Sequence, residues 1–213
     1  MPSPSTRQRR KDARPQELLD AAMALFVEKG FAATKSEEVA ARAGVSKGTL
    51  YLYFPSKEEL LKAAIRHTLS ADIAAGAQMA EAHTGSCSEL LQDVMSAWWL
   101  RVYSSSSACI FKLVLTEVRN FPDIADFYLR EVIEPGTAVI TRMVQRGIDA
   151  GEFRPVDVTG TVHSIVLPMI MLCVHKHSLG ACPNMEASLG DPELFIRQHM
   201  SLLLGGLRRP AAT

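Results

Sequence analysis

The sequence carries no net charge, few aromatic residues and no uninterrupted apolar run of the length that a membrane span needs. It has 23 Lys and Arg against 23 Asp and Glu, and 7% of its residues are aromatic. Its longest apolar candidate, residues 162–174, contains His163, Ser164 and Pro168 and is shorter than the ~18 residues of a transmembrane helix. Residues 1–15 contain no apolar segment of a secretory signal. We therefore expect a cytoplasmic protein with no membrane partner.

Cysteine pairs and catalytic motifs are also missing. None of the four cysteines belongs to a CxxC pair, and a chain of 213 residues needs no disulfide to bury a core, so we expect reduced, mostly buried thiols. Cys173, His175, His177 and Cys182 raise the question of a metal site. Positions 173 and 177 share one helical face while His175 points nearly opposite, which favours buried or interfacial histidines over metal ligands.

The sequence has no nucleophile elbow, no phosphate-binding loop and no pair of carboxylates at catalytic spacing. We therefore predict that the protein is not an enzyme and that it has neither a metal nor a cofactor.

The charges are distributed unevenly along the chain. Residues 1–67 hold 12 Lys and Arg against 8 Asp and Glu, a balance of +4, whereas residues 68–213 hold 11 against 15, a balance of −4. A basic N-terminal part followed by a mildly acidic body is typical of a nucleic-acid-binding domain joined to a second domain.

Helical periodicity runs through the chain, and no stretch alternates like a strand, so we predict an all-α fold of about nine helices. Pro15 and Gly30 bound a first helix with one apolar stripe, and Thr34 with Glu37 reads as the capping box of a second. The third and fourth helices are expected at residues 47–53, capped by Ser46, and from residue 56 to about 82. Later helices are predicted near residues 88–103, 108–119, 124–134, 137–150, 156–179 and 192–204, with a break at Pro135-Gly136 and a kink at Pro168.

The segment Ala-Gly-Val-Ser at residues 43–46 joins two short helices and indicates a helix-turn-helix. Gly44 permits the backbone reversal and Ser46 starts the second helix, whose N-terminal residues meet base edges in the major groove. Gly48 costs stability inside a helix, about 1 kcal/mol relative to alanine, and close approach to DNA is a benefit that offsets it. The alternative is that Tyr51 and Tyr53 are ordinary half-buried packing residues.

A stretch of about 45 residues in the N-terminal part contains Leu25-Phe26, Gly30-Phe31, Thr34, Val39-Ala40, Ala43-Gly44-Val45-Ser46, Gly48-Thr49-Leu50-Tyr51, Tyr53-Phe54 and residues 56–61. In these elements the chain resembles, without a gap, the signature of the TetR family of bacterial transcriptional regulators. The resemblance implies an N-terminal three-helix DNA-binding domain and a C-terminal helical domain that binds a small molecule and forms a dimer. We expect a basic flexible arm at residues 1–14, the DNA-binding domain at 15–68, and the ligand-binding and dimerisation domain at 69–213.

The resemblance also assigns DNA-binding positions. They are Thr34, Lys35, Ser46, Lys47, Gly48, Thr49, Tyr51, Tyr53 and Lys57. Tyr51 and Lys57 fall where the family contacts phosphates, and Lys47 falls on its recognition face. Two positions depart from the pattern, because Lys35 replaces a small hydroxyl residue and Ser36 an apolar one.

The C-terminal part offers bulky or adaptable side chains as candidates for an apolar ligand pocket. They are Trp98, Trp99, Tyr103, Phe111, Leu115, Met143, His163, Met169 and Met171. The alternative for each is an ordinary core position. By the resemblance, the last two helices form the homodimer interface.

The predicted function is a ligand-responsive dimeric repressor that binds a palindromic double-stranded DNA operator and responds to a small apolar or amphipathic effector. The second hypothesis is an architectural or nucleoid-associated DNA-binding protein whose C-terminal domain binds a protein partner.

Overall fold

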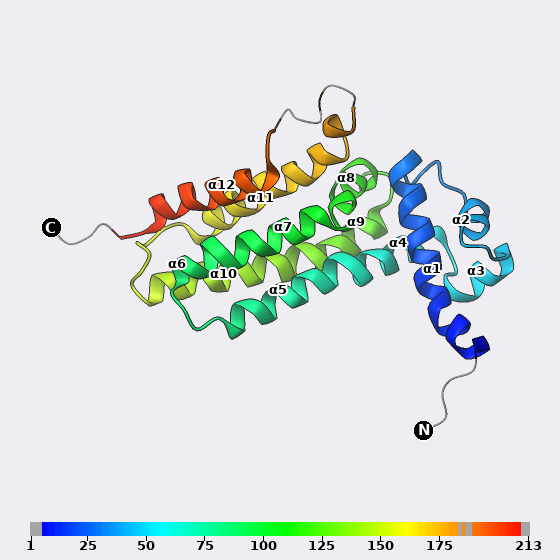
Figure 1. Cartoon of the computed structure of the whole chain (residues 1–213), viewed down its shortest axis with the longest axis horizontal. Helices are drawn as coiled ribbons and strands as arrows, with labels where there is room; N and C mark the ends of the chain where they lie inside the picture. Colours follow the sequence, from blue (N-terminus) through cyan, green and yellow to red (C-terminus); the bar gives the residue numbers. More distant parts are fainter. Residues whose placement is uncertain (1–5, 183–184, 186–188, 210–213) are drawn as a thin grey trace.

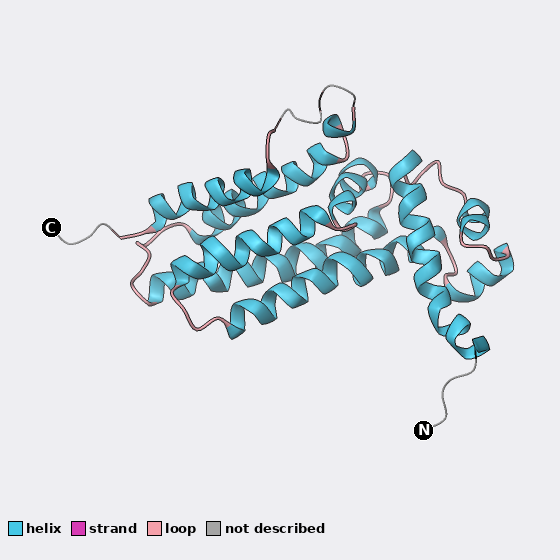
Figure 2. Cartoon of the chain, in the orientation of Figure 1, coloured by secondary structure: helices cyan, strands magenta, loops and turns pink. Residues whose placement is uncertain are grey.

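The computed structural model describes residues 6–182, 185 and 189–209, with side chains from residue 14 onward. Over these residues the chain forms nine continuous helices and no strand, apart from an isolated bridge between Phe153 and Arg208. A small group of helices at the N-terminal end sits against one end of a long helical bundle (Figure 1), and loops make up the remainder of the described chain (Figure 2). The all-α prediction is confirmed.

The N-terminal group consists of α1 (Thr6–Lys29), α2 (Ser36–Arg42), α3 (Lys47–Tyr53) and the start of α4 (Lys57–Ile65). The bounds of α3 agree with the prediction because local caps set them: Ser46 Oγ accepts from the Thr49 amide at 3.1 Å. At the start of α4, Ser56 Oγ accepts from the Glu59 amide at 3.2 Å.

The start of α1 differs from the prediction, since the helix begins at Thr6 and continues through Pro15. Residues 6–14, expected as part of a flexible arm, are therefore helical. A proline removes only one backbone hydrogen bond from a helix, and the Arg, Lys, Gln and Ala residues around it are good helix formers.

The capping box of α2 lies one residue later than predicted. The Lys35 amide donates to Glu38 Oε2 at 2.9 Å, while Thr34 Oγ1 donates back to the Gly30 carbonyl at 2.7 Å. The prediction of a Thr34–Glu37 capping box is therefore wrong, because the threonine hydroxyl donates to a carbonyl at the end of α1 instead of capping α2.

Three long helices of the bundle each contain a π-helical turn. They are α4–η1–α5 (Lys57–Ile65, Arg66–Ser70, Ala71–Ala82), α6–η2–α7 (Cys87–Glu89, Leu90–Met95, Ser96–Ser104) and α9–η3–α10 (Pro122–Tyr128, Leu129–Ile133, Glu134–Asp149). The predicted break at Pro135-Gly136 is wrong. Pro135 is the second residue after the π turn, and the irregular hydrogen bonding of that turn accommodates the missing amide hydrogen within one continuous helix.

The bundle is completed by α8 (Ala108–Glu117), α11 (Val158–Lys176), the short η4 (Leu179–Ala181) and α12 (Pro192–Leu207). One cluster of buried apolar residues runs through both the N-terminal group and the bundle. Phe31, after α1, meets Phe121, before α9, edge to face with ring centroids 4.9 Å apart. This aromatic pair joins the two parts of the molecule.

Four free cysteines occur in the chain, of which Cys87, Cys109 and Cys173 are buried and Cys182 is exposed. Burial raises the pKa of Cys109 to about 11. No group of three His, Cys, Asp or Glu side chains suited to a metal ion occurs within the described residues.

Candidate DNA-binding surface and ligand cavity

Helix α3 is held by one buried side chain and presents its opposite face to solvent. Leu50 is completely buried against the N-terminal core, and Gly44, with φ of 65°, makes the turn that sets α3 across α2. A Cβ atom at Gly48 would meet only Ser46 Oγ, at 3.8 Å. Packing within the chain therefore does not require glycine at position 48.

The open face of α3 consists of Lys47, Gly48, Tyr51 and Leu52. Leu52 is 84% exposed, the largest exposed fraction among the large apolar side chains of the described chain. Sequence reasoning missed Leu52, although its position one residue after Tyr51 and two after buried Leu50 places it on the outer face of the helix.

Thr49 and Tyr53, two other predicted DNA-binding residues on α3, are half-buried. The Thr49 hydroxyl lies 2.9 Å from Ser46 Oγ, and the Tyr53 ring packs on the core cluster. These two side chains therefore help to hold α3 in place.

The cations near α3 are paired with carboxylates of the same domain. Lys47 forms a short ion pair with Glu37 of α2, Lys29 contacts Glu38 at 2.5 Å, and Arg42 contacts Glu28 at 2.6 Å. Because of its hydrogen bond to Lys47, the pKa of the Glu37 carboxyl is lowered, and the same bond raises the pKa of Lys47. Three long basic side chains of this surface thus form ion pairs within the N-terminal group.

Lys57 lies in a different environment from the other predicted phosphate contacts. Its ammonium group donates to the carbonyls of Phe31 at 2.7 Å, Ala32 at 3.2 Å and Thr34 at 3.1 Å, and lies 4.4 Å from the centroid of the Phe31 ring. The three donors of an ammonium group match these three acceptors. Lys57 therefore fixes the loop that leads from α1 into α2.

Two predicted residues precede α2. Thr34 is 2% exposed, with its hydroxyl turned to the end of α1, whereas Lys35 is exposed. Only the second presents its side chain to solvent.

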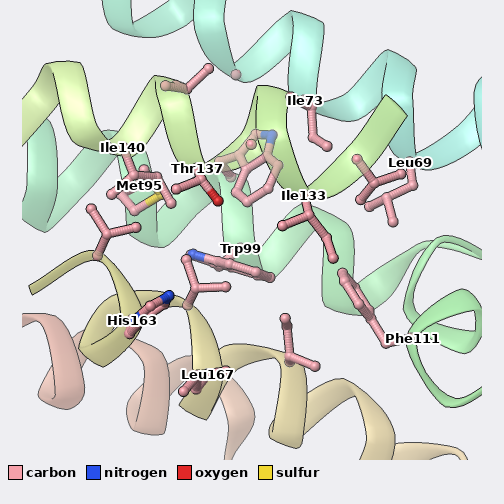
Figure 3. Close-up of a pocket in the computed structure, with 18 of the residues that line it drawn as sticks. Leu69, Ile73, Met95, Trp99, Phe111, Ile133, Thr137, Ile140, His163 and Leu167 are labelled. Atoms are coloured by element: carbon pink, nitrogen blue, oxygen red, sulfur yellow. The ribbon is translucent and has the colours of Figure 1, made fainter. Parts of the chain in front are cut away.

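An apolar cavity of about 280 Å³ lies within the bundle between α5, α7, α8, α10 and α11 (Figure 3). Each π-helical turn contributes to its wall, with Leu69 from η1, Met95 from η2 and Val132 from η3. At its edge lie Leu115, Ile133 and Leu167, whose side chains are 58%, 47% and 58% exposed.

Six residues proposed from the sequence as pocket candidates line this cavity, namely Trp98, Trp99, Phe111, Leu115, Met143 and His163. Three others do not. Tyr103 packs under the Lys176 ammonium, 4.5 Å from its ring centroid, Met169 is buried in the core, and Met171 is 60% exposed on the outer side of α11. Sequence reasoning did not select Tyr128 or Thr137, which also line the cavity.

The outer faces of α11 and α12 carry exposed apolar side chains. Leu167 and Met171 on α11, and Leu194 and Leu202 on α12, are between 53% and 77% exposed. A Cβ atom added at Gly205 or at Gly206 would meet nothing within 4 Å. Figure 1 shows these two helices side by side along one edge of the bundle.

Within the described residues, one helical stretch, Val158–Ala181, is long and apolar enough to cross a membrane, with a mean hydropathy of 1.6 over its most apolar window. This result rests on length and composition alone, and the apolar helix of a soluble bundle meets the same criterion.

Residues 18–64 match the family described as bacterial regulatory proteins, tetR family. Over 170 residues, which make up 78% of this chain and 81% of the relative, the sequence is 32% identical to the HTH-type transcriptional regulator YfiR of Bacillus subtilis. The chain belongs to the TetR family. It is a DNA-binding transcriptional regulator with a helix-turn-helix, and it is not an enzyme.

Other TetR-family proteins match almost the whole chain at lower identity. The HTH-type transcriptional repressor KstR2 of Mycolicibacterium smegmatis is 23% identical over 196 residues, which cover 92% of this chain and 91% of the relative. A structure of the regulator FadR of Bacillus subtilis in complex with stearoyl-CoA superposes with a TM-score of 0.73 at 21% identity, and the match covers 90% of this chain and 98% of that one. At this identity the FadR likeness shows the shared fold.

Proposed function

We propose that this TetR-family regulator is a dimeric repressor whose operator is palindromic and whose DNA affinity falls when a small apolar or amphipathic molecule occupies the cavity. In this proposal residues 15–68 bind DNA and residues 69–213 bind the ligand and form the dimer. The observation that carries the proposal is the apolar cavity, which is bounded by α8 and by the α9–η3–α10 helix, and the loop between these elements contacts the DNA-binding domain through Phe121.

On the DNA side, we propose that the open face of α3 enters the major groove, with Ser46, Lys47, Gly48 and Thr49 nearest the bases and Tyr51 and Tyr53 beside the sugar-phosphate backbone. Lys35, exposed at the start of α2, is proposed to contact a phosphate. For Lys57 and Thr34, the hydrogen bonds to backbone carbonyls support an indirect contribution through the shape of the loop before α2.

Dimerisation is proposed to occur through α11 and α12. Burying the exposed Leu167, Met171, Leu194 and Leu202 side chains would remove apolar surface from water, and Gly205 and Gly206 would allow a second backbone to approach closely. A two-fold dimer also presents two α3 helices to two half-sites, which a single helix-turn-helix needs for specific affinity.

The ligand acts as a switch in this proposal. The dimer has one form in which the spacing of its two α3 helices matches the operator and one in which it does not. A molecule that binds the second form more tightly lowers the affinity for DNA, and the ratio of its affinities for the two forms limits the size of this effect. The continuous helix α4–η1–α5 connects the two parts, since η1 and α5 line the cavity and α4 packs on α1. Named relatives of this fold support an apolar or amphipathic effector: the FadR neighbour contains stearoyl-CoA, and KstR2 of Mycobacterium tuberculosis is described as a ketosteroid transcriptional regulator.

Selection of random DNA duplexes by the purified full chain tests the proposal. We expect recovered sequences to contain an inverted repeat with half-sites one helical turn or more apart, bound by one dimer or by a pair of dimers. Recovery of unrelated sequences with no inverted repeat would contradict the proposal of a palindromic operator. That result would favour an architectural DNA-binding protein.

A further inference from the structure

We propose that the effector is an uncharged, mainly apolar molecule of moderate size with a hydrogen-bond acceptor, and that Trp99 Nε1–H is the donor that binds this acceptor. This inference rests on the proposed ligand response. It adds the chemical class of the ligand and the side chain that orients it.

The cavity wall has no Lys, Arg, Asp or Glu side chain that could pair with a charged ligand. Its polar side-chain atoms come from Trp98, Trp99, Tyr128, Thr137 and His163. Transfer of a carboxylate or an ammonium group from water into an apolar cavity without a counter-charge costs far more free energy than transfer of a neutral polar group. A neutral ligand therefore fits this wall better than an anion or a cation.

The size of the cavity limits the ligand as well. Its volume is about 280 Å³. An apolar cavity of ~150 Å³ holds benzene, so roughly twelve non-hydrogen atoms fill this one without movement of its walls.

The two adjacent tryptophans differ in the state of their indole N–H groups. Trp98 Nε1 donates to the Asp72 carbonyl at 2.8 Å and is therefore satisfied within the fold. Trp99 is 3% exposed and its Nε1 has no hydrogen-bond partner. A buried donor left without a partner costs about 1–3 kcal/mol, which a ligand acceptor would recover.

The labelled polar side chains lie toward one end of the cavity. Figure 3 shows the Trp99 nitrogen, the Thr137 oxygen and the His163 ring on one side, together with Met95 and Ile140, and Leu69 and Phe111 on the other. A ligand with its acceptor at one end and a hydrocarbon part at the other matches this arrangement. A ketone, an ester or an ether satisfies the requirement.

Three probes of similar size test the inference by isothermal titration calorimetry with the full chain: butyrophenone, which has a ketone acceptor, butylbenzene, which lacks one, and 4-propylbenzoate, which is an anion at pH 7. In the Trp99→Phe variant a smaller aromatic ring replaces the indole and the N–H donor is lost, and the control variant Trp98→Phe undergoes the same loss of size. We expect its affinity for butyrophenone to fall by about two- to tenfold, the equivalent of one hydrogen bond, and its affinity for butylbenzene to change by less than twofold.

The matched control is Trp98→Phe, which removes an N–H that the fold already uses, and we expect it to change the affinities for butyrophenone and butylbenzene by equal factors. The inference is overturned if Trp99→Phe weakens both neutral probes equally, if 4-propylbenzoate binds more tightly than butyrophenone, or if no probe binds. A separate measurement of operator affinity with butyrophenone distinguishes the two proposals. Trp99-dependent binding that leaves operator affinity unchanged would contradict the ligand switch and leave the chemical class of the cavity's ligand supported.

Discussion

At the residue scale, the pair between Lys47 and Glu37 holds the most prominent cation of the recognition helix against a carboxylate of α2. In the proposed complex, a phosphate or a guanine edge that binds Lys47 would compete with the Glu37 carboxylate, and this carboxylate would also repel the DNA backbone. We predict that Glu37→Gln increases affinity for duplex DNA by about two- to fivefold at low salt, with a smaller gain at high salt because surface charges are screened.

Fluorescence anisotropy with a labelled duplex at several salt concentrations measures this effect. Glu81→Gln, an equal charge change at an exposed position on α5, is the control and should leave affinity unchanged. An equal gain in both variants would show that net charge, rather than release of Lys47, is responsible.

Lys57 gives a second prediction at this scale, because its ammonium group already has three carbonyl acceptors. Lys57→Met keeps the aliphatic stem over Phe31 and removes the donors. We expect it to lower the free energy of unfolding by about 1–3 kcal/mol, since carbonyls of the α1–α2 loop lose their partner. Chemical denaturation measures this loss of stability. The salt dependence of DNA binding tests the alternative, in which Lys57 contacts a phosphate of the DNA. A reduction of the salt slope by about one unit with unchanged stability would identify Lys57 as a phosphate contact instead.

At the element scale, the short helices of the DNA-binding domain were predictable because local hydrogen bonds determine where they begin. Ser46 and Ser56 cap α3 and α4 as their sequence context indicates. Thr34 was misread because a threonine hydroxyl can cap the following helix or bond back to the preceding one, and the choice depends on how α1 packs on α2.

The long helices were harder to predict, because Pro15 indicated the start of a helix and Pro135 indicated a break between two helices. The helix continues through both of them: good helix formers surround Pro15, and Pro135 lies just after a π turn. The three π-helical turns were also not predicted, and each of them borders the cavity. A π turn changes the register of the side chains around a helix without a characteristic residue pattern, so this part of the cavity wall could not be inferred from spacing.

Helix α12 carries the prediction for dimerisation, since Leu202 is 77% exposed at the middle of its outer face. A glutamate at a two-fold interface would be desolvated and would lie near the same residue of the partner subunit. We predict that Leu202→Glu raises the dimer dissociation constant by about a hundredfold or more and weakens operator binding with it. Analytical ultracentrifugation measures the first effect. Met79→Glu, on α5 and 40% exposed, is the control, and an equal loss of dimer in both variants would argue against α12 as the interface.

At the scale of the whole molecule, a continuous series of contacts connects the cavity to the recognition domain. Phe111 and Leu115 of α8 line the cavity, and the α8–α9 loop that follows places Phe121 against Phe31. The Phe31 ring and carbonyl in turn contact Lys57, which also binds the carbonyl of Thr34 just before α2. In the proposed switch, a displacement of α8 would reach the α1–α2 loop through three packed or hydrogen-bonded side chains, Phe121, Phe31 and Lys57.

This series of contacts predicts that Phe121→Ala separates ligand binding from DNA release. Coupling between two sites in one protein is typically worth about five- to 150-fold in affinity, and loss of the aromatic contact should reduce it toward onefold while each site keeps most of its own affinity. The measurement is operator affinity with and without butyrophenone, in wild-type protein, Phe121→Ala and Phe121→Leu. The leucine variant retains most of the apolar contact and should show intermediate coupling. Undiminished coupling in Phe121→Ala would rule out the Phe31–Phe121 contact as the connection and leave the continuous α4–η1–α5 helix to transmit the change, because η1 lines the cavity and α4 packs on α1 independently of this aromatic pair.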